Sequence, residues 1–398
     1  MSRILIACPP WEGHLNPTIG VATVLQSMGH EVAWIAHDAV HHLLGQANVF
    51  SAGAIPEVAQ CSSEVRGLAA LQNCWNDWYF PVAISMDAAV LNAIARFSPD
   101  AMLVDQQAIG AALRAHQTGL PWLTLASSPG ELATRRDHPS ILQWTKALVE
   151  KLARQLGIGS IPNDALFSSF GCIMPSCPAL MGPVPDDLLV HDVGCLARHR
   201  RSSTINQEVS PSGLRILVTL GTFDHEANAK LLQDTLAAAH ELGSRTHWTI
   251  VDPNGLLGTD DGHEYITIQR RIRQIDVLPG VAAVVCHGGH NTIAESLLFG
   301  IPVVVAPIKN DQPYIAQKVV EAGAGLRIRS AHVTASHIAS AVGRVITEPH
   351  FRDAAQRMSI ALFSGAEERV SALLASWLAD PSRPLTPHPF TSVRSVDR

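Results

Sequence analysis

The segment His287-Gly288-Gly289-His290-Asn291-Thr292 follows directly on the apolar run Val281–Cys286. A strand, a glycine pair and a helix start in this order place free backbone N–H groups against a phosphate. The glycines allow a ligand to approach the backbone closely. His287 can donate to a phosphate oxygen and offset charge that develops on a leaving group. The spacing of Thr292 and Glu295 also fits a structural capping box, and both interpretations can hold together.

The segment Asn310-Asp311-Gln312-Pro313 follows the apolar stretch Pro302–Ala306. A carboxylate beside an amide at the end of a strand suits bidentate contact with vicinal hydroxyls, as on a sugar. The structural alternative is the N-cap of a helix that begins at Pro313. Gly221-Thr222 ends another strand and forms a further turn where a phosphate could bind.

His14 lies between the first expected strand and a helix for which Asn16 is a suitable N-cap and Pro17 a suitable first residue. Ligands bind at this edge of open α/β sheets. The helix N-terminus disfavours the imidazolium, so His14 is expected to act as a neutral base. Asp105 ends another strand of the same half, and a carboxylate hydrogen bonded to an imidazole fixes its tautomer. A structural role for His14 remains the alternative.

Four aromatic residues of the first half are candidates for an apolar ligand pocket. They are Trp11, Trp75, Trp78 and Tyr79. The alternative is that they fill the core of the first domain.

Short β-branched strands alternate with amphipathic helices, which is typical of parallel α/β sheets. The expected strands are Arg3–Cys8, Glu31–Ala36, Ala101–Asp105, Trp122–Ala126, Arg215–Leu220, His247–Val251, Ala282–Cys286 and Pro302–Ala306. The polar, irregular stretch near 196–213 predicts a linker between two such series. We expect domains at 1–200 and 214–350 around a linker at 201–213, closing helices at 351–380, and a disordered tail at 381–398.

Composition limits the class of protein. The chain has 398 residues, 47% of them hydrophobic and 16% charged, which excludes an intrinsically disordered chain. The net charge of −6 argues against nucleic-acid binding. No apolar run approaches the length of a membrane span, the N-terminus does not read as a signal peptide, and the seven cysteines are scattered. A reduced, cytoplasmic protein is expected.

Taken together, these motifs resemble the family 1, UDP-glucosyltransferase-like enzymes of the GT-B fold, in the bacterial branch that glycosylates natural products and antibiotics. The resemblance rests on the HGGxNT core at 287–292, Glu295, Gly300-x-Pro302, Asp311-Gln312, Gly323-x-Gly325, Gly13-His14-x-Asn16-Pro17 and Gly29-His30-x-Val32. It covers the whole chain in layout.

The resemblance implies two facing Rossmann-like domains, with the acceptor domain first, the nucleotide-sugar domain second and the C-terminal helices crossing back. It implies that His14 is the general base held by Asp105. It assigns the donor diphosphate to His287, Gly288, Gly289, Asn291, Thr292 and Thr222, the ribose to Glu295, and the transferred sugar to Asp311 and Gln312.

The chain departs from the family where an aromatic residue usually stacks on the uracil or thymine. Arg271-Ile272-Arg273-Gln274 stands there, so Gln274 matches and Arg271 could provide the stacking instead.

The implied reaction is an inverting transfer of sugar from a UDP- or dTDP-sugar to a hydroxyl of a hydrophobic acceptor such as a polyketide, carotenoid or phenolic. No metal or other cofactor is expected, because the chain lacks a DxD motif. Two alternatives remain: a GT-B nucleotide-sugar epimerase or hydrolase, and a non-catalytic binder of hydrophobic metabolites. A dehydrogenase is disfavoured because the GxGxxG fingerprint is missing.

Overall fold

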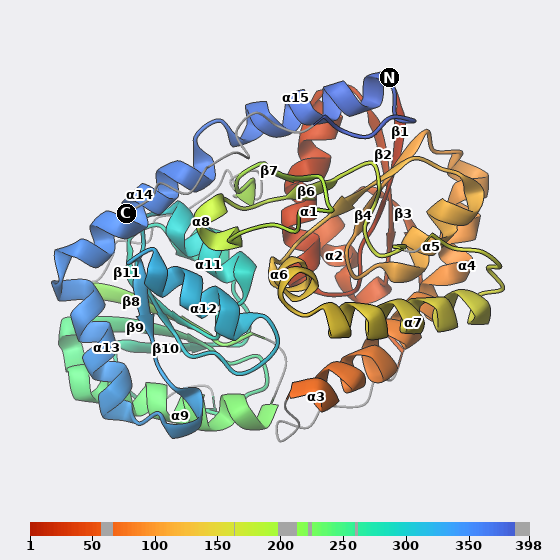
Figure 1. The fold of residues 1–398 in the computed structure, drawn as a ribbon. Coiled ribbons are helices and arrows are strands. Elements are labelled where there is room, and N and C mark those ends of the chain that lie inside the picture. The colour runs from red at the N-terminus through yellow and green to blue at the C-terminus, as the bar shows by residue number, and fades with distance from the viewer. Residues whose placement is uncertain (57–66, 163, 198–212, 222–224, 259–261, 387–398) are drawn as a thin grey trace.

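The computed structural model describes residues 1–56, 67–162, 164–197, 213–221, 225–258 and 262–386. They form two domains, each built around a sheet whose strands all run parallel (Figure 1). The expected α/β fold is therefore confirmed. Of the expected linker at 201–213, only Gly213 lies among the described residues.

The first sheet has seven strands in the order β3-β2-β1-β4-β5-β6-β7. They are β1 (Arg3–Ala7), β2 (Glu31–Ala36), β3 (Asn48–Ser51), β4 (Ala101–Asp105), β5 (Trp122–Leu125), β6 (Cys172–Met174) and β7 (Val190–Asp192). Its helices are α1 (Glu12–Ser27), α2 (His41–Leu44), α3 (Gly67–Asn73), α4 (Phe80–Phe97), α5 (Ile109–Thr118), α6 (Gly130–Asp137), α7 (Pro139–Gln155) and α8 (Pro178–Met181). A π-helical segment, Cys74–Tyr79, joins α3 to α4.

The second sheet has six strands in the order β10-β9-β8-β11-β12-β13. They are β8 (Leu214–Thr219), β9 (Thr246–Val251), β10 (Ile266–Gln269), β11 (Val281–Cys286), β12 (Val303–Val305) and β13 (Gly325–Arg327). Its helices are α9 (His225–Leu242), α10 (Gln274–Val277), α11 (His290–Leu298), α12 (Gln312–Glu321), α13 (Ala335–Thr347) and α14 (Pro349–Phe363), followed by α15 (Ala366–Ala379).

The eight expected strands are present, each within one residue at either end. Five further strands were not anticipated: β3, β6, β7, β10 and β13. These are only three or four residues long and lie at or next to the sheet edges, so they carry little of the apolar pattern that identifies a buried strand.

Each sheet is buried on both faces because helices cover both sides, as parallel sheets require. In β1, Ile4 and Ile6 belong to the core shared with α1, while Leu5 and Ala7 belong to the core shared with α4 and α5. The strand's two-residue period therefore supplies two hydrophobic cores at once.

The C-terminal helices divide between the domains. α15 crosses to the first domain and packs on α1, with Val370, Leu374 and Trp377 buried in that core (Figure 1). α14 instead packs on α11 of the second domain. The expectation that all of 351–380 packs on the first domain was wrong for α14, because Ala354, Ala355 and Met358 face the second core.

The expected disorder of the tail is wrong for its first residues. Leu385 is buried and its N–H donates to the Phe170 carbonyl at 2.7 Å. Residues 387–398 lie outside the described residues.

One helical run, Ala69–Phe97, is long and apolar enough to cross a membrane by length and composition alone. This differs from the sequence expectation. Val82, Met86, Val90 and Phe97 of this run are buried in the core of the first domain, and core helices of soluble proteins pass the same test.

Candidate active site

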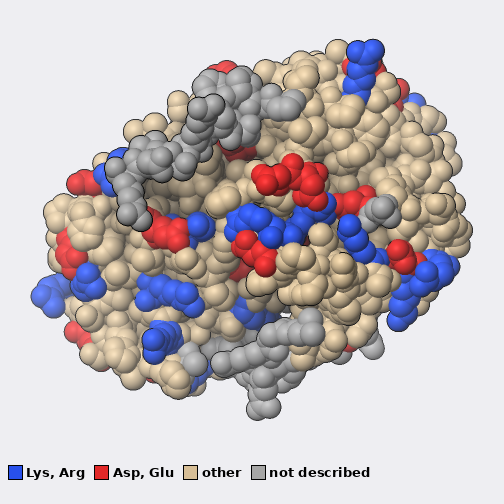
Figure 2. All heavy atoms as spheres, viewed as in Figure 1, with Lys and Arg blue, Asp and Glu red and all other residues tan. Residues whose placement is uncertain are grey.

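A cleft of about 1930 Å³ lies between the two domains. Its walls come from the turns after β1, β4 and β5 of the first sheet and after β8, β11 and β12 of the second. Since the carboxyl ends of parallel strands meet at one sheet edge, both domains present their ligand-binding edges to this cleft. On the face drawn in Figure 2, acidic and basic side chains gather together over the middle of the molecule, between its two halves.

His14 and Asp105 are brought together by adjacent strands. β1 pairs with β4, so the segment after β1 lies over the last residue of β4. His14 Nδ1 lies 2.9 Å from Asp105 Oδ1 and 2.7 Å from the Ser127 hydroxyl, which follows the neighbouring strand β5. The Asp105 side chain is fully buried, whereas that of His14 is 16% exposed and lines the cleft. The carboxylate requires a proton on Nδ1, which leaves Nε2 for a substrate.

Two expectations about His14 need correction. α1 begins at Glu12, so Asn16 and Pro17 lie inside the helix and Asn16 is not its cap. Burial lowers the pKa of His14, but the charge and hydrogen bond of Asp105 outweigh it and raise that pKa above its ordinary value, with help from Glu131 and Asp311. The nearby carboxylates therefore override the helix N-terminus.

Glu131 on α6 is a cleft residue that sequence reasoning missed. The amides of Gln106 and Gln107 each donate to one of its carboxyl oxygens at 2.6 Å. Burial raises the pKa of Glu131 to about 7, the bond from Gln107 opposes the rise, and the charge of Asp311 adds to it.

The glycine loop after β11 encloses His287. Ideal Cβ atoms at Gly221 and Gly289 would lie 3.1 and 2.8 Å from its imidazole, so a side chain at either position would crowd the ring, and Gly221 also has φ +77°. Gly288 has φ +95° and faces Val305 and Gln312 rather than lining the cleft. Burial lowers the pKa of His287 to about 4. The ring is therefore neutral near pH 7, and it can donate a hydrogen bond but brings no charge.

Polar residues at the start of α11 form a closed network instead of a capping box. Glu295 accepts from Gln274 at 2.8 Å and from Asn291 at 3.0 Å, and the Thr292 hydroxyl donates to Gln274 at 3.3 Å. The N-cap of α11 is Gly289, with no side-chain cap bond, so the capping-box interpretation was wrong. All four residues of the network line the cleft.

The Asp311-Gln312 pair meets the first domain at the start of α12. The Ser128 hydroxyl donates to Asp311 Oδ2 across the cleft. Gly130 makes this approach possible, since a Cβ there would lie 2.5 Å from that of Asp311. Asp311 occupies the N-cap position, but its side chain makes no cap bond. Gln312 Oε1 accepts from the backbone N–H groups of Ile308 and Lys309, so its carbonyl shapes the loop.

Arg271 lies at the cleft mouth with its side chain 69% exposed, and its guanidinium is 3.5 Å from a carboxyl oxygen of Glu12 in the first domain. The position is open enough for a planar ligand to lie against it.

The four candidate aromatic residues all line the cleft, and they also belong to the packing of the first domain. Trp11 stacks on Trp78 with 5.6 Å between ring centroids and meets the His14 ring edge-on at 5.7 Å. Trp75, Trp78 and Tyr79 come from the π-helical segment, a rare geometry that often marks functional sites. The core and pocket interpretations therefore both apply.

Most of the sequence-predicted site residues converge on this cleft. Those lining it are His14, Gln274, His287, Gly289, Asn291, Thr292, Glu295, Asp311, Gln312 and the four aromatic residues. Asp105 lies buried behind His14, and Thr222 lies outside the described residues. Within the described ranges, no group of three or more His, Cys, Asp or Glu residues could hold a metal ion.

Sequence reasoning missed four polar residues besides those: Ser127, Ser128, Glu131 and His290. Ser127 and Ser128 follow directly on β5, so extending the strand-end rule to every strand would have found them.

Comparison with known proteins agrees with this architecture. Residues 264–367 match the family model of the erythromycin biosynthesis protein CIII-like C-terminal domain. The chain is 24% identical to 4'-demethylrebeccamycin synthase of Lentzea aerocolonigenes, over 90% of this chain and 94% of that protein.

Solved structures share the fold. The glycosyltransferase VinC in complex with dTDP superposes with a TM-score of 0.68 at 20% identity, over 93% of this chain and 99% of that one. A spinosyn rhamnosyltransferase complexed with spinosyn aglycone gives 0.72 at 19% identity, over 95% and 100%.

The fold is that of the GT-B glycosyltransferases, and relatives that match most of the chain are glycosyltransferases of natural-product biosynthesis, which indicates that this chain is a glycosyltransferase.

Proposed function

We propose that the protein is an inverting glycosyltransferase that moves a sugar from a UDP- or dTDP-sugar to a hydroxyl of a hydrophobic small molecule. The observation that carries the proposal is the His14–Asp105 contact of 2.9 Å, at the wall of a cleft whose opposite wall holds the glycine loop. A base and a phosphate-binding loop on facing domains are what direct displacement requires.

In the proposed reaction, Nε2 of His14 takes the proton of the acceptor hydroxyl while its oxygen attacks the anomeric carbon. The new carbon–oxygen bond forms as the bond to the diphosphate oxygen breaks, so the configuration inverts. Asp105 then stabilises the imidazolium.

The leaving nucleoside diphosphate would bind at the loop formed by His287, Gly288 and Gly289, where α11 begins. A helix N-terminus and free backbone N–H groups favour an anion, and the neutral His287 ring can add one hydrogen bond. Asn291, Thr292 and Thr222 would assist. In the proposed reaction these groups offset the negative charge of the leaving diphosphate, and no metal ion takes part.

The rest of the donor would follow the turns of the second domain. Glu295 would hold the ribose hydroxyls, Asp311 and Gln312 the transferred sugar, and Arg271 would lie against the base, with Gln274 supporting Glu295. The dTDP in the VinC structure supports a thymidine or uridine nucleotide.

The acceptor would lie against Trp11, Trp75, Trp78 and Tyr79. Stacked indole rings beside the base favour a flat or extended apolar molecule, such as a polyketide, carotenoid or phenolic. The aglycone in the spinosyn rhamnosyltransferase structure supports this class. Cys8, Cys172, Cys177 and Cys286 are buried free thiols, which supports a cytoplasmic location.

The test is turnover of UDP-glucose and a dTDP-deoxysugar with a flavonoid, a macrolide aglycone and a carotenoid diol, followed by chromatography. His14→Ala should lose on the order of 10²–10⁴-fold in rate. The matched control is His350→Ala, an exposed histidine on α14 that does not line the cleft.

Near-normal transfer by His14→Ala would contradict the base assignment. Rapid consumption or epimerisation of the donor without any acceptor would instead favour the epimerase or hydrolase alternative. The anomeric configuration of the product, measured by NMR, tests inversion.

A further inference from the structure

Ser127 contacts the same nitrogen of His14 that Asp105 holds. Its hydroxyl oxygen lies 2.7 Å from Nδ1, and Asp105 Oδ1 lies 2.9 Å from that atom. Because the carboxylate requires Nδ1 to carry the proton, Ser127 Oγ acts as a second acceptor for it. The imidazole is therefore held in its plane by oxygens from two neighbouring strands, β4 and β5.

The backbone of Ser127 is in turn tied to the second domain. The ring of His290, the first residue of α11, has its Nε2 2.9 Å from the hydroxyl of Ser176, and the main chain of Ser127 acts on the same ring to oppose the lowering of its pKa. Burial lowers the pKa of His290 to about 4, so the ring is neutral. A neutral imidazole has one donor and one acceptor nitrogen, so a His290 ring that accepts from Ser176 at Nε2 has its other nitrogen free to donate to the Ser127 carbonyl.

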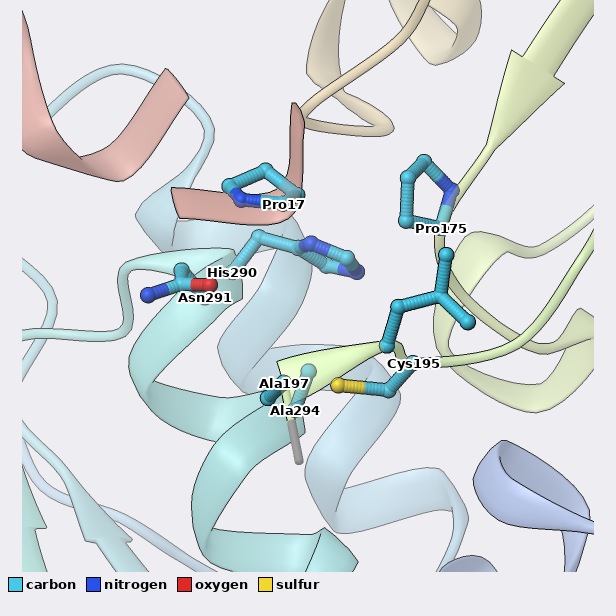
Figure 3. Close-up of a pocket in the computed structure, with 8 residues that line it drawn as sticks. Pro17, Pro175, Cys195, Ala197, His290, Asn291 and Ala294 are labelled. Carbon is cyan, nitrogen blue, oxygen red and sulfur yellow. The ribbon is translucent and has the colours of Figure 1, made fainter. Parts of the chain in front are cut away.

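Packing fixes the His290 ring in this position. Figure 3 shows the ring directed toward the space between Pro17 of α1 and Pro175, with Cys195 nearby. The pocket that these residues line has a volume of only about 10 Å³, and His290 is buried, so the ring is closely packed. Its neighbour Asn291 belongs to the Glu295 network in the proposed donor site.

We propose that Ser127 and His290 are positioning residues that join the proposed base to the proposed donor loop across the domain interface. The inference rests on the proposed function of His14. The path runs from α11 through His290 to the Ser127 backbone, and from the Ser127 hydroxyl to His14. The base is then correctly oriented only when the donor domain is docked against the end of β5.

The pKa of His14 distinguishes a positioning role from a purely structural one, because loss of a structural contact alone would leave that pKa unchanged. The charged groups facing His14 are Asp105 from β4, Glu131 from α6 and Asp311 at the start of α12. Cys8, the residue after β1, also senses this carboxylate, since burial and the charge of Asp105 raise the pKa of its thiol. Removing the Ser127 hydroxyl leaves all of these in place and withdraws only one acceptor from the protonated ring.

The experiment measures kcat/KM against pH for the full chain with its best donor and acceptor. Ser127→Ala should lower kcat/KM about threefold to tenfold and move the acid limb to lower pH by about half a unit, because the imidazolium loses one hydrogen bond. His290→Leu should shift the limb in the same direction. His290→Gln should restore much of the wild-type profile, since its amide can donate to Ser127 and accept from Ser176.

Tyr314→Phe is the matched control. It removes an interdomain hydrogen bond, from the Tyr314 hydroxyl to the Met181 carbonyl at 2.9 Å, that does not reach His14. Its acid limb should stay at the wild-type position.

The inference is overturned if Ser127→Ala and His290→Leu keep the wild-type acid limb, even when their rates fall, or if Tyr314→Phe moves the limb equally. Failure of the proposed function looks different. There, His14→Ala itself keeps its activity, and the inference falls with it.

Discussion

The pKa values of two histidines in one cleft are shifted in opposite directions. His14 is half-buried beside Asp105, Glu131 and Asp311, and its pKa is raised. His287 is half-buried between two glycines with no carboxylate among the groups that shift its pKa, and that pKa falls to about 4. Burial acts in the same direction on both rings, so the neighbouring charge decides the difference. The first histidine is suited to accept a proton, and the second to donate a hydrogen bond while neutral.

The two walls of the cleft also differ in the groups that surround these histidines. The wall of the first domain carries the carboxyl groups of Asp105 and Glu131, which favour a group that gains positive charge during reaction. The facing loop of the second domain carries a glycine pair and a helix N-terminus, which favour an anion. The carboxyl groups of the second-domain wall, Glu295 and Asp311, are held by Gln274 and by Ser128, and neither is among the groups that shift the pKa of His287.

The largest expected effect comes from removing the charge that distinguishes His14. Asp105→Asn should lower kcat on the order of 10³-fold, because an amide no longer enforces the Nδ1–H tautomer and no longer stabilises the imidazolium. The acid limb of kcat/KM should also move to lower pH, since the pKa of His14 falls. Asp100→Asn, which changes an exposed carboxylate outside the cleft, is the control and should keep wild-type kinetics. A profile identical to wild type for Asp105→Asn would show that the charge does not govern His14.

The second prediction concerns the neutral histidine. His287→Ala should cost about 10²–10³-fold in kcat if the ring donates to the diphosphate. His287→Gln should recover part of that loss, since an amide also donates one hydrogen bond without charge. The ratio of the Gln variant to wild type should stay constant from about pH 5.5 to 8, because a pKa of about 4 leaves His287 neutral throughout. A ratio that changes with pH over that range would mean that the ring titrates there.

The third prediction tests how closely the two walls approach. Gly130→Ala places a Cβ against that of Asp311, at an ideal distance of 2.5 Å. The domains must then separate locally, and kcat should fall about tenfold, from an overpacking cost of about 1–3 kcal/mol. Gly159→Ala is the control, since nothing lies within 4 Å of its ideal Cβ. Unchanged turnover for Gly130→Ala would show that the contact with Asp311 is not needed during reaction.

The smallest effect is on stability and belongs to Glu131. Its pKa is raised to about 7 in the folded protein, above the unfolded value near 4.5, so the folded state binds more protons between these values. Stability is therefore lost as pH rises from about 4.5 to 7. Glu131→Gln should remove this loss. The free energy of unfolding of the variant minus that of the wild type should be larger at pH 8 than at pH 5 by about 1–2 kcal/mol. Urea unfolding at the two pH values measures it, and an equal difference at both would contradict the prediction.

Much of the fold could be predicted from local sequence. The strands with strong β-branched runs were found because burial on both faces demands continuous apolar residues, as in Val281–Cys286. The short edge strands were missed because three or four residues carry no such pattern. The start of α1 was misplaced because the Asn16-Pro17 cap signal lies within a helix that tertiary packing extends to Glu12.

Some residues of the candidate site could likewise be predicted from local sequence, and others could not. Residue types and strand-end positions were enough to single out His14, Asp105, His287 and Asp311, since a parallel sheet brings the ends of its strands to one edge. Ser127 follows the end of β5 and could have been found by the same rule, whereas the contacts of Glu131 and His290 were not foreseeable, because each depends on an approach between segments far apart in the chain. The acidities were decided by the fold alone. Desolvation and neighbouring charge act over a few ångströms in space, and linear distance along a chain does not specify them.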